Sequence, residues 1–137
     1  MIAVDTNIVV RYAVKDDPDQ TRIATEWLHG NRCLLLPTVV LETVWVLSSK
    51  QGYRLDTGTV AARIRHVAGL PTVRVESAPQ MARALDWYEA GMDFADALHL
   101  ALAGSEIGLA TLDRRIATLA RRLDLGYRVV LLGAKRK

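Results

Sequence analysis

Residues 2–10 read IAVDTNIVV, and this stretch decides the fold class. Residues 2–5 are typical of a short buried strand that ends at Asp5. The segment from Thr6 to Val14 predicts a short helix that leaves the strand. The opening of the chain therefore predicts a strand-to-helix unit with one carboxylate at the carboxyl end of its strand.

The rest of the chain repeats this alternation. Short apolar or alternating segments predict further strands at residues 32–36, 72–76, 108–111 and 127–132. Proline, glycine and capping residues predict helices at residues 18–30, 37–51, 56–69, 77–91, 93–106 and 114–124. Together they predict an α/β fold of three layers, with a mainly parallel central sheet of about five strands flanked by helices.

Length and composition limit the class of protein. The chain has 137 residues, which predicts one domain over residues 1–137. Half of the residues are hydrophobic (50%), a share typical of a globular protein and not of a disordered one. No apolar run reaches the roughly 18 residues of a membrane span, and the N-terminus does not resemble a signal peptide. These features predict a cytoplasmic protein, in which the single cysteine, Cys33, is buried and unreactive.

The net charge of +3 is weak support for a polyanionic partner. The basic residues crowd into the last quarter of the chain: Arg114, Arg115, Arg121, Arg122, Arg128, Lys135, Arg136 and Lys137. They fit either a solvated helix face with a soluble tail or a phosphate-binding surface.

Four carboxylates lie in or beside strongly apolar stretches: Asp5, Glu42, Asp96 and Asp113. A carboxylate beside a core costs free energy unless something pairs it, so a shared divalent metal ion is the obvious candidate partner. Ligands of open parallel sheets bind beyond the carboxyl ends of the strands. Two of the acids follow predicted strands, and the other two lie in the first two turns of predicted helices. All four are therefore expected to converge at one edge of the sheet.

Helical spacing refines these expectations. Glu42 shares a helix face with Val39 and Val46, so its side chain is expected to point toward the sheet and not into bulk water. Asp93 and Asp96 are three residues apart near a helix N-terminus, where carboxylates are favoured. Asp93 also fits a simple N-cap, whereas Asp96 lies one turn inside the helix, where capping does not require it.

An all-oxygen set of ligands selects Mg²⁺ or Mn²⁺ over Zn²⁺. Such a site can polarise a phosphodiester, lower the pKa of a bound water and stabilise the leaving oxygen. The sequence leaves open whether one metal ion or two would bind, and Asp113 also fits an N-cap. His99 turns away from Asp93 around the helix, so it is expected in the core or at an interface.

The order of these motifs resembles that of a known family. IAVDTNIVVRY is similar to the opening motif of PIN domains, which are small Mg²⁺-dependent nucleases. VVLETVWVL and DFADALHLALA resemble the second and third acidic motifs of that family, and ATLDRRIA resembles the fourth. Order, spacing and length over essentially the whole chain are similar to VapC-type ribonuclease toxins of toxin–antitoxin pairs.

The resemblance implies a ribonuclease that uses Mg²⁺, or Mn²⁺. The catalytic quartet that holds the metal would be Asp5, Glu42, Asp96 and Asp113. Asp93 would be an accessory acid, and Thr111 would support the fourth member of the quartet. Thr6 and Asn7 would orient the first aspartate or a metal-bound water, unless they only cap the following helix. The resemblance also implies an RNA substrate, a homodimer, and a VapB-like antitoxin that blocks the acidic site in a toxin–antitoxin hetero-oligomer.

Several further side chains have two possible roles. Three arginines fit either contacts to substrate phosphate or plain surface charge: Arg11, Arg114 and Arg115. Three tryptophans have core-like spacing, with an interface to a second copy or an antitoxin as the alternative: Trp27, Trp45 and Trp87. Ile23 is expected to face inward, whereas His29 and His66 are expected at the surface.

Two other classes of function compete with a ribonuclease. A non-catalytic PIN module that binds RNA or protein is opposed by the intact quartet. A phosphotransfer domain is opposed by the first motif, in which Asp5 is followed by Thr6 and Asn7. A receiver-like domain would need an acidic pair there, and a haloacid-dehalogenase-type phosphatase would need Asp-x-Asp.

Overall fold

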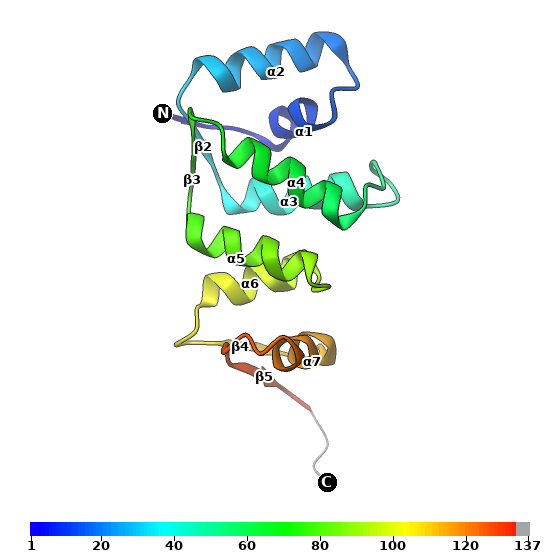
Figure 1. Ribbon diagram of the computed structural model, residues 1–137, viewed down its shortest axis with the longest axis vertical. Coiled ribbons are helices and arrows are strands. Elements are labelled where there is room, and N and C mark those ends of the chain that lie inside the picture. The colour runs from blue at the N-terminus through cyan, green and yellow to red at the C-terminus, as the bar shows by residue number, and fades with distance from the viewer. Residues whose placement is uncertain (134–137) are drawn as a thin grey trace. The chain divides into compact units, whose positions relative to one another are not determined.

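The computed structural model describes residues 1–133 as alternating strands and helices (Figure 1). In chain order they are β1 (Ile2–Ala3), α1 (Thr6–Val14), α2 (Pro18–Gly30), β2 (Cys33–Leu35), α3 (Pro37–Ser48), α4 (Thr57–Ala68), β3 (Val73–Val75), α5 (Ala78–Glu89), α6 (Phe94–Ala103), β4 (Leu109–Thr111), α7 (Arg114–Arg122) and β5 (Val129–Leu131). The chain divides into two compact units, Met1–Ala78 and the residues from Pro79 onward. Each unit is described by itself.

The first unit contains a parallel sheet of three strands in the order β1-β2-β3. Cys33 of β2 lies opposite Ile2 of β1 on one side and Val73 of β3 on the other. In this unit, α1 packs against α2, α3 and α4, and α4 also contacts β3.

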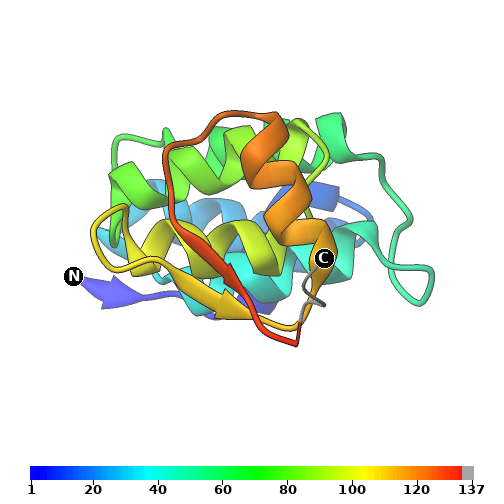
Figure 2. The same cartoon turned by 90° about the horizontal axis from the view of Figure 1, so that it is seen from below.

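The second unit contains a parallel pair of strands, with Leu109 of β4 opposite Val129 of β5. Figure 2 shows these two strands side by side, with α7 next to them. The helix α7 packs against β5, and α6 contacts β4. A T-shaped contact between Trp87 and Tyr127 (ring centroids 4.8 Å apart) joins α5 to the segment before β5.

The predicted α/β class is confirmed, but the predicted sheet is larger than the one observed. Within residues 1–133, three strands form one parallel sheet and two form another, in place of one sheet of about five strands. Each strand has only two or three residues. Apolar pattern finds such segments but does not say which strands hydrogen-bond to one another. The single domain over residues 1–137 stays a prediction.

Local capping signals explain why the helices begin where they were predicted. Asp17 has an extended backbone, and its side chain accepts a hydrogen bond from the backbone N–H of Gln20 at 3.1 Å, ahead of Pro18 in the first turn. Asp56 likewise accepts a bond from the N–H of Thr59 at 2.8 Å. Both α1 and α2 match their predicted bounds residue for residue.

Other helices differ from their predicted limits. Ser77 was expected to cap α5, but it has a φ of 56°, in the left-handed region and not the extended conformation of an N-cap. The helix α3 ends at Ser48 because the residues after it fold back, with the Tyr53 N–H bonded to the Val46 carbonyl at 3.1 Å. The helix α6 ends at Ala103, and α7 ends at Arg122.

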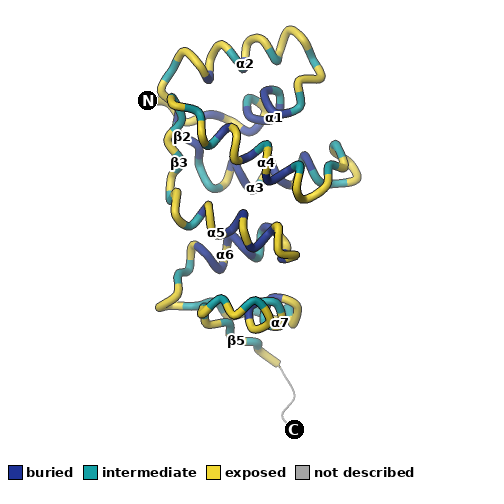
Figure 3. Tube along the Cα trace, in the orientation of Figure 1, coloured by how far each residue is buried: buried dark blue, intermediate teal, exposed yellow. Residues whose placement is uncertain are grey.

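Figure 3 shows the buried positions that form the core of each unit. In the first unit, fully buried side chains include Leu28, Val40, Leu47 and Val60. Cys33 is also fully buried, and burial raises the pKa of its thiol, which donates to the Asn31 carbonyl at 3.3 Å. The prediction of a buried thiol is therefore confirmed, and its low reactivity stays a prediction.

Three side chains that were expected to face inward are exposed. On α2, only Ala24 and Leu28 are buried, a stripe too narrow to include Ile23, which is 58% exposed, or Trp27, which is 37% exposed. Trp45 is 61% exposed because it lies off the buried face of α3. Trp87 alone of the three tryptophans is buried as expected.

None of the helices within residues 1–133 has the length and apolar character that crossing a bilayer requires.

Candidate active site

The side chain of Asp5 caps α1 just beyond the end of β1. Its Oδ1 accepts a hydrogen bond from the Thr6 N–H at 2.7 Å. Thr6 is therefore the first helical residue and not the cap, so the capping alternative for Thr6 is wrong. The Thr6 side chain is buried, and its hydroxyl has no hydrogen-bond partner among the described residues. A buried hydroxyl without a partner marks a place where a ligand could bind.

A pocket of about 380 Å³ brings Asp5 and Glu42 together in the first unit. Its lining comes from α1, α3 and the segment after α3: Asp5, Thr6, Asn7, Val10, Arg11, Glu42, Val46 and Tyr53. Glu42 is exposed, so the expectation that it points toward the sheet was wrong. Its i−3 neighbour Val39 is buried, but the helix turns Glu42 far enough to open onto the pocket.

Arg11 and Tyr53 on this pocket share one partner, Asp16. The Arg11 Nη1 donates to Asp16 Oδ1 at 3.0 Å, and the Tyr53 hydroxyl donates to Asp16 Oδ2 at 2.9 Å. The bond from Tyr53, with a smaller contribution from Arg11, lowers the pKa of Asp16. The same bond raises the pKa of Tyr53, so the phenol stays protonated as a donor.

In the second unit, Asp93 and Asp96 lie together at the start of α6. Asp93 is the N-cap, as its alternative interpretation predicted, and its Oδ2 accepts from the Asp96 N–H at 3.2 Å. Desolvation raises the pKa of Asp96, and the negative charges of Asp93 and Asp113 raise it further. Burial and the neighbouring negative charges therefore disfavour the ionised form of Asp96.

Asp113 is the N-cap of α7, which confirms its alternative interpretation. Its Oδ1 accepts from the Arg115 N–H at 2.8 Å, and the Arg115 guanidinium bonds both carboxylate oxygens. These bonds from Arg115 lower the pKa of Asp113. The Thr111 side chain contacts the backbone of Asp113: the Thr111 Oγ1 accepts a hydrogen bond from the Asp113 N–H at 3.0 Å.

The four acids are less buried than their apolar sequence surroundings predicted. Asp5 and Glu42 are exposed, and Asp96 and Asp113 are half-buried. Asp5 and Asp113 also receive backbone N–H bonds as N-caps. The expected cost of a carboxylate beside the core therefore applies mainly to Asp96. The structure places Asp5 with Glu42 in the first unit, and Asp93, Asp96 and Asp113 near one another in the second.

The remaining candidates lie on the surface. Arg114 is exposed, and the guanidinium of Arg115 is engaged by Asp113. His99 is exposed, which rules out the core position, and the alternative of an interface position stays a prediction. The described basic residues of the last quarter are exposed: Arg114, Arg115, Arg121, Arg122 and Arg128. The other three lie outside the described residues: Lys135, Arg136 and Lys137.

His29 and His66 are exposed as expected, but both reach a buried tyrosine. The Tyr12 hydroxyl lies 2.9 Å from His66 Nε2 and 3.3 Å from His29 Nε2. Tyr12 is 4% exposed, and Lys15 places its ammonium 4.0 Å above the ring. These contacts join α1, α2 and α4, and sequence spacing gave no sign of them.

Residues 2–122 match the family model of the PIN domain. The chain belongs to the PIN domain family. A search of the curated proteins finds no match to this sequence. PIN domains are generally nucleases, so the chain has a nuclease-type function in general, that of a hydrolase acting on nucleic acid. The match runs through both compact units, and it includes the four acidic motifs.

PIN domains are typically dependent on divalent metal ions, and the residues of this PIN domain fit such an ion. Asp5 and Glu42 offer hard oxygen ligands on one pocket, beside the unpartnered hydroxyl of Thr6. Within residues 1–133, however, no three His, Cys, Asp or Glu side chains are grouped so as to hold a metal by themselves. Asp5 and Glu42 nevertheless have the right chemistry for such an ion.

Sequence reasoning missed Asp16 and Tyr53. They lie in the segments after α1 and α3, separated by 37 residues, and neither belongs to a motif. The one local signal was Gly52 before Tyr53, which ends the predicted helix and marks a tight turn.

Proposed function

We propose that this PIN domain is a Mg²⁺-dependent endoribonuclease and acts as a VapC-type toxin. The observation that carries the proposal is the pocket on which Asp5 and Glu42 lie together, in a chain that belongs to a nuclease family. Asp96 and Asp113 are proposed as further metal ligands on the strength of their family motifs, with Mn²⁺ able to replace Mg²⁺. Asp93, Asn7 and Thr111 are proposed as supporting residues.

The chemistry divides between the ion and the protein. When bound, a divalent cation polarises the phosphodiester and favours ionisation of the attacking water. Asp5 and Glu42 would hold it by charge, and their exposure would let an RNA strand approach. Thr6 lines the same pocket, and its buried hydroxyl has no hydrogen-bond partner among the described residues. Arg11 offers a guanidinium to the substrate phosphate from the same wall.

The test compares Asp5→Asn with Asp56→Asn in an RNA cleavage assay with Mg²⁺. Both residues are N-caps, and asparagine also caps helices, so the two variants make the same change in unrelated places. Asp5→Asn is expected to lose at least about 100-fold in rate, since several kcal/mol of charge stabilisation depend on the metal site. Asp56→Asn is expected to keep the wild-type rate. An unchanged rate for Asp5→Asn would reject the mechanism.

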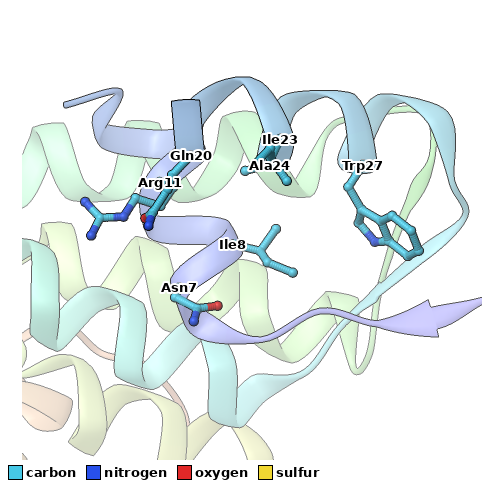
Figure 4. Close-up of a pocket in the computed structure, with 7 residues that line it drawn as sticks. All are labelled: Asn7, Ile8, Arg11, Gln20, Ile23, Ala24 and Trp27. Carbon is cyan, nitrogen blue, oxygen red and sulfur yellow. The ribbon is translucent and has the colours of Figure 1, made fainter. Parts of the chain in front are cut away.

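A VapB-like antitoxin is the proposed inhibitor. Figure 4 shows a second pocket, between α1 and α2, lined by Ile8, Ile23, Ala24 and Trp27. It shares Asn7 and Arg11 with the acidic pocket. An apolar peptide segment bound between these helices could therefore place a neighbouring basic side chain beside the acids.

Co-expression tests this partner. Expression of the chain alone is expected to arrest growth of the host cells. Co-expression of a small open reading frame adjacent to its gene is expected to relieve the arrest. Light scattering then measures the molar mass of the purified chain, which tests the proposed homodimer. The same measurement on the co-purified pair tests the proposed hetero-oligomer. If the wild-type chain cleaves RNA in vitro but does not arrest growth, the toxin role is rejected and the ribonuclease proposal stands.

A non-catalytic PIN module that binds RNA or protein is the second candidate. It applies if the acidic side chains bind no metal ion. Titration calorimetry with Mn²⁺ separates the two functions. Binding that is lost in Asp96→Asn supports the nuclease, and a lack of binding supports the non-catalytic module.

A further inference from the structure

The acidic pocket has a second half that metal binding does not explain. Arg11 and Tyr53 line the same pocket as Asp5 and Glu42. Asp16 receives a hydrogen bond from each of them, at 3.0 Å and 2.9 Å, one on each carboxylate oxygen. A single side chain outside the pocket lining therefore holds a cation and an aromatic ring beside two carboxylates.

The backbone around Tyr53 is built for close contact with α3. A Cβ on Gly52 would overlap the Val46 carbonyl oxygen, so only glycine permits this approach. Two backbone hydrogen bonds follow in the same segment. The Tyr53 N–H donates to the Val46 carbonyl, and the Leu55 N–H donates to the Leu47 carbonyl. Tyr53 is thus fixed to the helix that carries Glu42, and its ring has a defined position relative to that acid.

Stability alone does not explain this arrangement. Arg11 and Asp16 form a partly exposed ion pair, with side-chain exposures of 33% and 41%. Pairs of this kind contribute little to folding. An aromatic face next to a guanidinium is, in contrast, the usual means by which proteins bind an unpaired nucleotide. Every base can stack on the ring, and the guanidinium can bind the phosphate.

We propose that Tyr53 and Arg11 form a nucleotide-binding subsite at the edge of the acidic pocket, with Asp16 as the positioning residue. The ligand is an unpaired nucleotide of single-stranded RNA next to the phosphodiester that is cleaved: its base stacks on Tyr53 and its phosphate binds Arg11. The inference rests on the proposed ribonuclease function and names how that site takes its substrate. The subsite selects unpaired RNA because a base within a duplex cannot stack on the ring.

The experiment measures cleavage and binding of one short single-stranded oligoribonucleotide. Tyr53→Leu removes the ring and is expected to raise KM about tenfold, within the range of base–aromatic stacking, while kcat changes less than about twofold. Tyr53→Phe keeps the ring, loses the bond to Asp16 and is expected to stay within about threefold of the wild-type KM. Thermal unfolding of both variants checks that the fold is intact.

Arg11 and Asp16 have their own matched variants. Arg11→Ala is expected to raise KM, and Arg11→Lys, which keeps the charge, is expected to recover part of the loss. Asp16→Asn is expected to raise KM less than Tyr53→Leu, because it frees both side chains without removing either. Arg22→Ala is the control, since Arg22 is 60% exposed on α2, forms a pair with Glu26 and lies outside the pocket lining. A wild-type KM for Tyr53→Leu, or equal losses for Tyr53→Leu and Tyr53→Phe, would overturn the subsite.

Binding without metal separates this inference from the proposed function. The same oligonucleotide is titrated in EDTA by fluorescence anisotropy, with its duplex as a competitor. Weaker binding by Tyr53→Leu and poor competition by the duplex support the subsite, even if the wild type cleaves no RNA. Equal binding by wild type and Tyr53→Leu, or equal binding of single strand and duplex, overturns it even if the wild type is an active ribonuclease.

Discussion

Asp5 shows how one residue can serve both the fold and the site. Its Oδ1 accepts a hydrogen bond from the Thr6 N–H at the start of α1, and the residue also lines the pocket with Glu42. Asparagine can replace the first role but not the charge of the second. Substitutions at Asp5 can therefore separate stability from activity.

Asp5→Asn is expected to unfold within a few degrees of the wild-type Tm, whereas Asp5→Ala is expected to lose about 1 kcal/mol of unfolding free energy, the usual cost of removing a cap. Urea unfolding followed by circular dichroism measures both. Equal losses for the two variants would show that the cap bond at Thr6 does not stabilise α1.

Asp56 gives a pH-dependent prediction away from the site. The backbone N–H of Thr59, and then its hydroxyl, lower the pKa of Asp56. A carboxyl whose pKa is lower in the folded state stabilises the protein above its unfolded pKa of about 3.9, and this contribution is lost as the pH falls through the folded value. The difference in Tm between wild type and Asp56→Asn should therefore favour wild type at pH 7 and shrink below about pH 4. A difference that stays constant over this range would contradict the shift.

At the scale of elements, Gly52 is the most restrictive position in the first unit. Gly52→Ala is expected to cost about 2 kcal/mol, because its Cβ would meet the Val46 carbonyl, which cannot move without distorting α3. Gly30→Ala is the matched control, since its Cβ would meet nothing within 4 Å. Thermal unfolding compares them, and equal Tm values would contradict the close approach.

The helix α2 offers a second comparison. Leu28 is fully buried, so Leu28→Ala is expected to cost about 2–5 kcal/mol through lost burial and a cavity. Ile23→Ala on the same helix removes an exposed side chain and is expected to change the unfolding free energy by less than about 0.5 kcal/mol. Denaturant unfolding measures both, and similar losses would contradict the observed burial of α2.

The sequence predicted the helices better than their faces. The bounds of α2 follow from local signals, since Asp17 caps it and Pro18 opens it. Whether Ile23 or Glu42 is exposed depends on which helix lies next to each face, and no local signal shows that. The bond between Asp16 and Tyr53 joins two segments 37 residues apart, so pattern could not predict it. The acidic residues were found because each lies in a distinctive apolar motif.

At the scale of the whole molecule, the PIN domain match extends through both compact units. A single domain over residues 1–137 predicts one cooperative unfolding transition. Circular dichroism and tryptophan fluorescence should then give the same midpoint, since Trp27 and Trp45 lie in the first unit and Trp87 lies in the second. Two separated transitions would contradict the single-domain prediction.

The buried state of Cys33 has a practical consequence for chemical labelling. Reagents that modify thiols react with the thiolate, and this sulfur is both covered and hard to ionise. A cysteine introduced on the surface, for example by Gln20→Cys beside Ile23 and Trp27, could therefore carry a fluorophore without removal of the native thiol. Such a dye would report directly on any peptide that enters the space between α1 and α2.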